Sequence, residues 1–519
     1  MRVPSVMGHK FSEVPKARIQ RSTFNRSFGH KTTFDAGWLI PFYVDEALPG
    51  DTFNCRMTAF ARLATPLKPV MDNMFMDTFF FAVPNRLLWD NWEKFNGAQD
   101  NPADSTDFTI PRLADGYTVT EGSLSDYFGL PLGLSTTDHH ISQLPYRAYN
   151  LIYNEWFRDQ NIQNSVSEYV GDGPNGAANF NLKRRGKRHD YFTSCLPWPQ
   201  KGDSVSIPLG TSAEIHGRIG GVDLTVYNDD LGSYRELEID GVTNRLQMDN
   251  LGASQDVLYA DLTTATAATI NSLRQAFQIQ KLLERDARGG TRYTEILKAH
   301  FGVTSPDSRM QRPEYLGGGS TPVSISPVAN TSGNTGGSEN ANQGDLAGFG
   351  VAHVNGHGFT KSFTEHCTII GLVCVRADLT YQYGIDRMWS RQTRYDFYWP
   401  ALAHIGEQAV LSKEIYVDGT ANDEDVFGYQ ERYAEYRYKP SLITGQFRST
   451  AATPLDIWHL SQEFGSRPVL DNTFIEETPP VDRIIATPTE PHFLFDSYVR
   501  LTAARPMPLY GVPGLIDHF

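Results

Sequence analysis

Cysteine is scarce in this 519-residue sequence, which contains only Cys55, Cys195, Cys367 and Cys374. No two of them form a C-x-x-C pair, so neither a zinc ribbon nor a thioredoxin-type site is indicated. Cys374 lies seven positions after Cys367 in a strand-like run, and this odd offset places their side chains on opposite faces, which argues against a shared metal or disulfide. We therefore expect four buried thiols, no metal site and no cofactor.

Long apolar runs and catalytic motifs are also missing. No stretch approaches the roughly 18 residues that span a bilayer, and the first ten residues lack the hydrophobic block of a signal peptide, so a soluble protein made in the cytoplasm is expected. H-E-x-x-H, G-x-x-x-x-G-K-[ST] and G-x-S-x-G are all absent, and no residue is assigned a catalytic role.

Turn-forming and aromatic residues are abundant: there are 44 Gly and 30 Pro, and 12% of residues are aromatic. This composition is typical of a β-rich protein with long ordered loops. Apolar runs predict strands at 38–44, 52–63, 75–84 and 368–375, the last covered on both faces, and Tyr436 and Tyr438 suggest another strand. A helical pair is predicted at 264–302, ended by Gly302, with shorter helices near 87–95 and 146–160.

The charge is unevenly distributed. The formal net charge is −14, yet residues 1–31 contain seven basic residues and one acidic residue, so this segment carries +6 and the remainder −20. We interpret 1–31 as a basic arm and 32–519 as a single domain with insertions. Residues 317–350 are mostly Gly, Ser, Thr, Asn and Pro, so we expect a loop that cannot form a core of its own. Residues 476–519 contain seven prolines and are too Pro-broken for helices or central strands, so we expect an extended tail.

Four stretches carry a family resemblance. They are KRRGKRHDYFTSCLPWPQKGD (183–203), QAFQIQKLLERDARGGTRYTEILKAHFGV (275–303), SPDSRMQRPEYLGGG (305–319) and PLYGVPGLIDHF (508–519). In these stretches the sequence resembles the major capsid proteins of gokushoviruses, the small circular single-stranded DNA phages of the Microviridae. The resemblance is weakest between 211 and 257.

The resemblance implies an eight-stranded viral jelly roll and a structural role in a T=1 shell of roughly sixty subunits. It also implies partners: the single-stranded DNA genome, a DNA pilot protein, a scaffolding protein, a small internal DNA-binding protein and a host surface receptor. The implied location is the virion, assembled in the cytoplasm of a bacterial host. Periodicity alone does not separate a jelly roll from another β-sandwich.

Two basic groups are candidates for contact with DNA, because Lys and Arg neutralise phosphates without reading sequence. They are Arg2, Lys10, Lys16, Arg18, Arg21, Arg26 and Lys31 in the arm, and Lys183, Arg184, Arg185, Lys187 and Arg188 in the cluster. A salt-bridged subunit interface is an equally good interpretation of the cluster. The nearby His189, Tyr191, Phe192 and Trp198 could stack on unpaired bases, although core or interface positions are more common for aromatic residues beside prolines.

Two further segments are candidates for surface contacts. By position, 211–257 matches the insertion that builds surface protrusions in the family, and its candidate host-attachment residues are Asp223, Asp229, Asp230, Glu236, Glu238 and Asp240. An ordinary solvated hairpin is the alternative. The tail offers apolar side chains to a neighbouring subunit through Leu509, Tyr510, Leu515, Ile516 and Phe519.

Two other functions fit parts of the sequence. A carbohydrate-binding or carbohydrate-active β-sandwich protein would share the aromatic and Gly-rich composition but needs a saccharide cleft, with paired carboxylates if it is an enzyme. A non-capsid single-stranded DNA-binding protein would explain the basic arm but not the −20 elsewhere.

Overall fold

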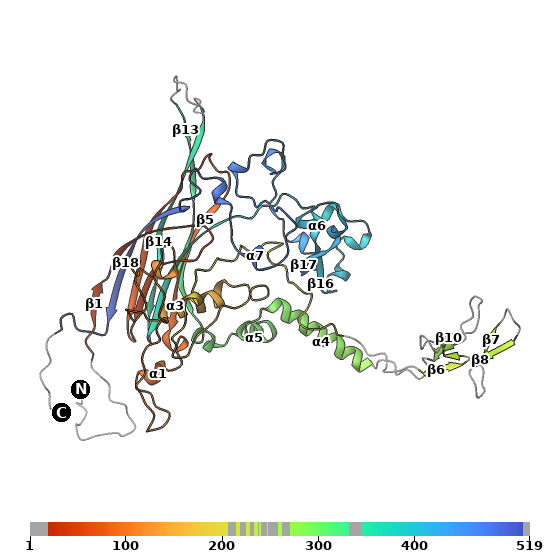
Figure 1. Ribbon diagram of the computed structural model, residues 1–519, viewed down its shortest axis with the longest axis horizontal. Helices are drawn as coiled ribbons and strands as arrows, with labels where there is room; N and C mark the ends of the chain where they lie inside the picture. The colour runs from red at the N-terminus through yellow and green to blue at the C-terminus, as the bar shows by residue number, and fades with distance from the viewer. Residues whose placement is uncertain are drawn as a thin grey trace. The chain divides into compact units, whose positions relative to one another are not determined.

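The computed structural model describes residues 19–205, 270–331 and 344–511, together with the backbone of six short strands between Glu214 and Asp261 (Figure 1). The chain divides into two compact units. Unit 1 comprises Met1–Pro199 and Gly289–Phe519, and unit 2 is Gln200–Arg288. The candidate surface insertion and most of the first predicted helix fall in unit 2.

Unit 1 is built on two antiparallel sheets. The six-stranded sheet contains, in the order of pairing, β1 (Ser22–Asn25) and β2 (Phe28–Phe34) on one side of β18 (Phe493–Arg505), then β4 (Thr52–Leu63), β14 (Leu346–Ser362) and β13 (Ser324–Ala329). The four-stranded sheet has the order β12 (Glu314–Pro322), β5 (Met74–Pro84), β15 (Cys367–Ala377) and β3 (Ile40–Ala47). In Figure 1 β13 and its partner on β14 project beyond the other strands of their sheet.

The pairing of these strands is nested along the chain. β2 pairs with β18, β3 with β15, β4 with β14 and β5 with β12, so the first strand of the set meets the last and the central two meet each other. Eight strands paired in this way across two sheets form a jelly roll. The predicted fold class, a mainly β jelly roll with helical insertions, is confirmed.

The main core lies between the two sheets. β4 alternates along its whole length: Phe53, Cys55 and Met57 are buried while Asn54 and Arg56 are exposed. β18 follows the same period-two pattern, and its inward side chains join the same core. Alternation of this kind is what a sheet with one buried and one open face requires.

The other face of the four-stranded sheet is covered too. Leu372 and Cys374 of β15 pack there against α3 (Leu144–Ile152) and Trp89. Cys367 and Cys374 belong to the cores on opposite sides of the sheet, as their spacing predicts. All four cysteines are buried free thiols, and burial raises the pKa of Cys55, Cys367 and Cys374 to about 12.

A third apolar cluster supports a small lobe of unit 1. The hairpin β16 (Glu407–Leu411) and β17 (Val426–Glu431) packs with α6 (Ser412–Ile415) and α7 (Asn472–Ile475) around Phe192. Two further short helices, α1 (Trp92–Phe95) and α2 (Leu124–Tyr127), lie in the long connection after β5.

The predicted helices are present. α4 spans Ile270–Gly289 and α5 spans Tyr293–Phe301, and Gly302 ends α5 with a left-handed φ of 70°. Both helices leave large apolar side chains exposed, such as Phe277 of α4 and Phe301 of α5. No described helix is both long and apolar enough to cross a membrane.

The structure corrects three predictions of irregular backbone. The basic arm ends earlier than 31, because residues from Ser22 onward form β1 and β2, short polar strands with little hydrophobic alternation. Residues 317–350 contribute to β12, β13 and β14. A Cβ at Gly318 or Gly319 would collide with Thr78 or His357, so these glycines allow close packing rather than flexibility.

The tail at 476–519 contains a central strand. Its prolines fall before and after 493–505, and this Pro-free stretch is β18, which pairs with β4, β1 and β2. Conversely, Tyr436 and Tyr438 do not lie in a strand, since the chain makes a short 3-10 turn at Ala434–Tyr436.

In unit 2 the structure describes residues 200–205, the backbone of six short strands, and helix α4 with its side chains. The strands are β6 (Glu214–Gly217), β7 (Thr225–Asn228), β8 (Ser233–Glu236), β9 (Glu238–Ile239), β10 (Leu246–Gln247) and β11 (Leu258–Asp261), paired as β6 with β11, β7 with β8 and β9 with β10.

Candidate nucleic-acid interface

The predicted cluster at 183–188 is an extended strap between two parts of unit 1. The backbone N–H of Arg185 donates to Gly37 O (2.8 Å), and Arg185 O accepts from the N–H of Glu477 (2.8 Å). Lys187 N–H donates to Ile475 O (2.7 Å). We call residues 183–188 the basic strap, because its backbone joins the segment before β3 to the segment after α7.

Most of the strap's cations have partners inside the protein. The Arg184 guanidinium lies 4.1 Å from the centroid of the Trp38 ring and donates to Glu477 O (3.1 Å). Arg185 forms an ion pair with Asp77, which also accepts from Arg376 Nε (2.9 Å). These positive charges are therefore already compensated by the fold.

Asp77 is the carboxylate that pairs with both Arg185 and Arg376. Its side chain is only 7% exposed. Burial opposes ionisation, but hydrogen bonding from Ser320 and the guanidinium groups of Arg185 and Arg376 outweigh it and hold the pKa of Asp77 below its ordinary value. The carboxylate is thus charged, and it neutralises two arginines at once.

Lys187 is buried in the same region. Its Nζ donates to Phe474 O (2.5 Å) and lies 4.6 Å from the centroid of the Phe474 ring. Burial lowers the pKa of Lys187 to about 8, and the negative charge of Glu477 only partly offsets this. A lysine in this setting is held against α7 and is not free to reach a ligand.

The other strap cations are less enclosed. Lys183 is half-buried, and burial lowers its pKa. Arg188 is the most accessible member: 62% of its side chain is exposed, and its ion pair to Asp378 is 3.3 Å long.

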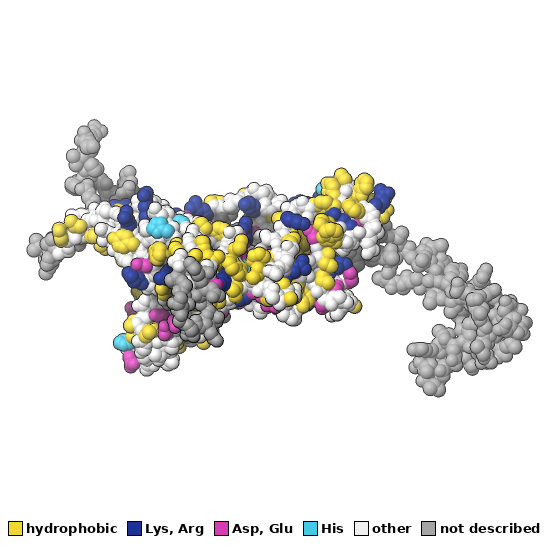
Figure 2. All heavy atoms as spheres, turned by 90° about the horizontal axis from the view of Figure 1, so that it is seen from above, with side chains coloured by type: hydrophobic (Ala, Val, Ile, Leu, Met, Phe, Trp, Pro, Cys, Tyr) yellow, Lys and Arg dark blue, Asp and Glu magenta, His cyan; other side chains and the backbone are white. Residues whose placement is uncertain are grey.

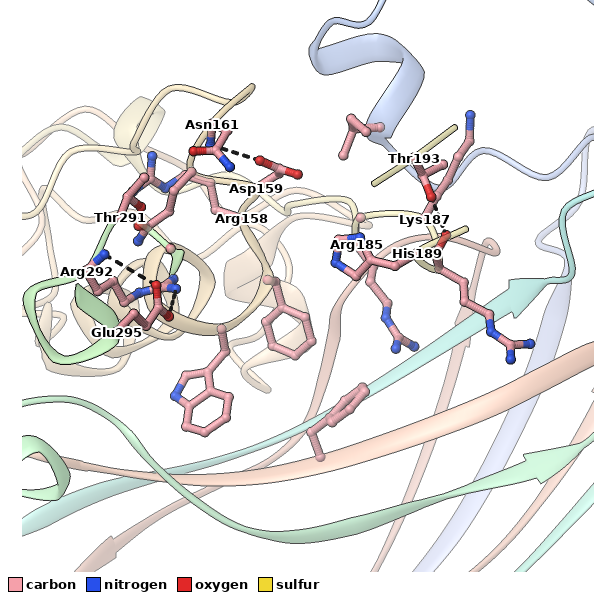
Figure 3. Close-up of a pocket in the computed structure, with 18 of the residues that line it drawn as sticks. Arg158, Asp159, Asn161, Arg185, Lys187, His189, Thr193, Thr291, Arg292 and Glu295 are labelled. Atoms are coloured by element: carbon pink, nitrogen blue, oxygen red, sulfur yellow. Dashed lines mark hydrogen bonds and ion pairs between the residues drawn. The ribbon is translucent and has the colours of Figure 1, made fainter. Parts of the chain in front are cut away.

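The strap lines one wall of a cavity of about 790 Å³ (Figure 3). In Figure 3 Arg185, Lys187 and His189 lie at one end, and Arg292 and Glu295, joined by their ion pair, lie at the other. The remaining wall is largely aromatic: Phe79, Phe81, Trp156, Phe157 and Tyr315. The cavity can hold a flat or anionic group, but a phosphate would compete with ion pairs that already exist.

The arm cations that the structure describes are paired as well. Arg26 makes two hydrogen bonds to Asp45 (2.6 and 2.9 Å), Lys31 forms an ion pair with Asp496 (3.3 Å) and Arg21 donates to Thr52 Oγ1 (2.9 Å). Arg2, Lys10, Lys16 and Arg18 lie outside the described residues.

The aromatic residues after the strap divide into two groups. Tyr191 and Phe192 are buried in the core of the β16–β17 lobe, and Tyr191 Oη donates to Glu414 (2.8 Å), so the hypothesis that these two rings stack on bases is wrong. His189 is exposed and Trp198 is partly exposed.

The other predicted site residues are described only in part. In the candidate host-attachment segment, Glu236 ends β8 and Glu238 begins β9, whereas Asp223, Asp229, Asp230 and Asp240 lie outside the described residues. In the tail Leu509 and Tyr510 are exposed, whereas Leu515, Ile516 and Phe519 lie outside the described residues.

Sequence reasoning missed a second cationic surface on the six-stranded sheet. Arg56 and Arg62 of β4 and Arg500 of β18 are exposed on its outward face. The available signal was the alternation itself, because every second residue of the predicted strand 52–63 points away from the core, and two of those residues are arginines.

Comparison with known proteins identifies several related proteins and a family model that matches this chain. A family model described as "Capsid protein (F protein)" matches residues 12–515. The chain is 48% identical over 529 residues to capsid protein VP1 of Bdellovibrio phage phiMH2K, with 98% of each chain covered. It is 42% identical over 595 residues to capsid protein VP1 of Chlamydia phage 1, with 99% of each covered. With capsid protein VP1 of Spiroplasma virus 4 the identity is 35% over 549 residues, covering 98% of this chain and 97% of the other.

Proposed function

Because this chain belongs to the capsid protein (F protein) family, we propose that it is the subunit of a T=1 shell of roughly sixty copies around single-stranded DNA. Its role is structural rather than enzymatic and its place is the virion, in keeping with the family resemblance of the sequence. Assembly in the cytoplasm of a bacterial host belongs to the proposal.

A large exposed aromatic surface carries this proposal beyond family membership. It lies on the segment after β15 and on the turn after β17, and we define the aromatic surface by Trp389, Tyr395, Phe397, Tyr398, Trp399, Tyr436 and Tyr438, all of them exposed. Trp389, for example, is 75% exposed. Figure 2 shows hydrophobic side chains at the molecular surface in groups, interspersed with Lys and Arg. Apolar surface of this kind marks protein contacts, and Trp and Tyr are enriched among the residues that dominate them.

Cations accompany these rings. The Arg391 guanidinium lies 4.4 Å from the Tyr436 ring centroid, and that of Arg394 lies 5.3 Å from the Trp399 ring centroid. Arg and aromatic side chains together are typical of the centres of protein interfaces. We infer that the aromatic surface packs against another copy of the chain.

Electron microscopy of the purified full chain tests assembly. The wild-type chain should form uniform icosahedral particles. The double variant W389S/Y395S should remain dispersed while keeping its thermal unfolding, because both side chains are exposed in the subunit. The control L132S removes another exposed apolar side chain that is not part of the aromatic surface, and it should still assemble. A wild-type chain that stays monomeric under every condition would contradict the proposal.

The terminal and surface segments complete the proposal. Exposed Leu509 and Tyr510 support a tail that contacts a neighbouring subunit, and the separate unit Gln200–Arg288 supports a protrusion that meets a host receptor. A pilot protein, a scaffolding protein and a small internal DNA-binding protein are the further proposed partners. Exchange of 211–257 between related phages should transfer adsorption specificity; unchanged host range would speak against attachment by this segment.

A further inference from the structure

The outward face of the six-stranded sheet brings arginines of two distant strands together. In the register of β4 and β18, Arg56 lies opposite Arg500, Thr58 opposite Tyr498, Phe60 opposite Asp496 and Arg62 opposite Leu494. All eight of these residues point away from the core. We call this surface of β4 and β18 the open face.

Arg56 and Arg500 are like charges at directly opposite positions of two paired strands. Opposed residues of an antiparallel pair have Cβ atoms about 5 Å apart, and like charges there destabilise a sheet. Within the described parts of the chain, neither guanidinium, nor that of Arg62, forms an ion pair or donates a hydrogen bond. The fold thus leaves three exposed positive charges on one face of the sheet, two of them directly opposite each other, and the described residues supply no acid to compensate them.

The charge of the open face contrasts with that of the whole chain. Along β2, β18, β4 and β14 the outward charged residues are Lys31, Arg56, Arg62 and Arg500 against Asp496, and Asp496 is already paired with Lys31. The chain as a whole carries −14. A local positive surface on an acidic protein fits a polyanionic partner.

Aromatic side chains lie between the arginines. Phe60 and Tyr498 are each 49% exposed, and His353 of β14 lies opposite Phe60 on its other side. Successive outward residues of a strand are about 7 Å apart, so Phe60 lies one such step from Arg62 and two from Arg56. Rings exposed on a flat surface among cations offer stacking platforms to unpaired bases, whereas the bases of a duplex are unavailable for such stacking.

We propose that the open face binds single-stranded nucleic acid, with Arg56, Arg62 and Arg500 on phosphates and with Phe60 and Tyr498 stacked on bases. This inference rests on the proposed function, since it names the surface by which the shell holds its genome. Recognition is independent of sequence, because guanidinium groups on phosphates and rings on bases read no base edge.

The test measures binding of a fluorescein-labelled 20-nucleotide oligo-dT and of a duplex of equal length to the unassembled full chain at several salt concentrations. R56Q/R500Q should weaken oligo-dT binding at least tenfold and make the slope of log K against log salt less steep by about 1.4, about 0.7 for each lost phosphate contact. F60L/Y498L should weaken binding about tenfold and leave the slope unchanged, because stacking releases no counterions.

Matched variants separate this surface from general charge effects. R448Q/K298Q removes two exposed cations outside the sheet and should stay within twofold of the wild type, and R56K/R500K should keep the wild-type slope. Ultraviolet cross-linking of the wild-type chain to oligo-dT needs no substitution and should map to peptides containing Phe60 or Tyr498. Equal losses in R448Q/K298Q, cross-links confined to the basic strap, or stronger binding of the duplex would overturn the proposal.

Particle analysis distinguishes failure of this inference from failure of the proposed function. If R56Q/R500Q forms wild-type particles with a reduced DNA content per particle, both stand. If it forms particles with undiminished DNA, the open face is not the DNA surface, although the shell function remains. If the wild-type chain forms no particles, the shell function fails whatever the oligonucleotide measurements show.

Discussion

Two cationic regions of unit 1 have opposite electrostatic arrangements. The basic strap is dense in sequence, but Arg185 shares Asp77 with Arg376, and Lys187 is buried against Phe474. The open face is sparse in sequence, yet Arg56 and Arg500 lie opposite each other there, and no carboxylate of the described residues forms an ion pair with either. The density of basic residues along a chain therefore does not measure the positive charge that a ligand can use. What decides it is whether the fold brings acids to those residues.

The largest effect expected from this comparison is on Asp77. In D77N the guanidinium groups of Arg185 and Arg376 lose their shared charge partner in a largely buried site, which should lower the free energy of unfolding by about 3 kcal/mol. Chemical denaturation of the unassembled chain measures this. The control D496N removes an exposed carboxylate paired with an exposed lysine and should change the free energy by less than about 0.5 kcal/mol. Equal losses in both variants would contradict the comparison.

The next largest effect expected is a pH dependence of the free energy of unfolding that is caused by Lys187. The folded chain holds the Lys187 proton less tightly than the unfolded chain, because burial lowers the pKa from 10.5 to about 8. Between these pH values the unfolded state binds more protons, so the free energy of unfolding should rise with pH, by about 2 to 3 kcal/mol in total.

Substitution of Lys187 isolates that contribution. K187M fills a similar volume without a charge, so it should unfold at higher denaturant concentration at pH 7 and lack the extra rise between pH 8 and 10.5. Denaturation of both chains at several pH values measures the difference in their free energies of unfolding. All groups other than Lys187 titrate in both chains, so their contributions cancel in this difference. A rise of the same size in K187M would show that Lys187 does not cause it.

Local pattern predicted much of the fold. Period-two alternation at 52–63 identified β4, the odd spacing of Cys367 and Cys374 placed them on opposite faces of β15, and Gly302 marked the end of α5. Each of these inferences depends on residues within one element. The jelly-roll topology needed the family resemblance, because alternation says nothing about which strands pair.

Partners distant in sequence explain what could not be predicted. Arg185 and Asp77 are 108 positions apart, and nothing near either residue signals their ion pair. Likewise, the glycines of β12 have the composition of a mobile loop, and only the closeness of Thr78 and His357 shows why they are needed in a sheet. The same limit hid the open face, whose arginines become neighbours only when β18 pairs with β4.

The smallest effect expected is a gain in stability on the open face. Replacing the opposed arginines in R56Q/R500Q removes a cross-strand repulsion and should raise the free energy of unfolding by about 0.2 to 1 kcal/mol at low salt. The gain should shrink as salt screens the two charges, and denaturation at low and high ionic strength measures it. A loss of stability would mean that the two guanidinium groups stabilise the sheet, which contradicts the expected repulsion between them. A gain in stability combined with weaker binding of single-stranded DNA would identify a surface that the fold maintains at a cost to its own stability, which is the usual relation between stability and a functional site.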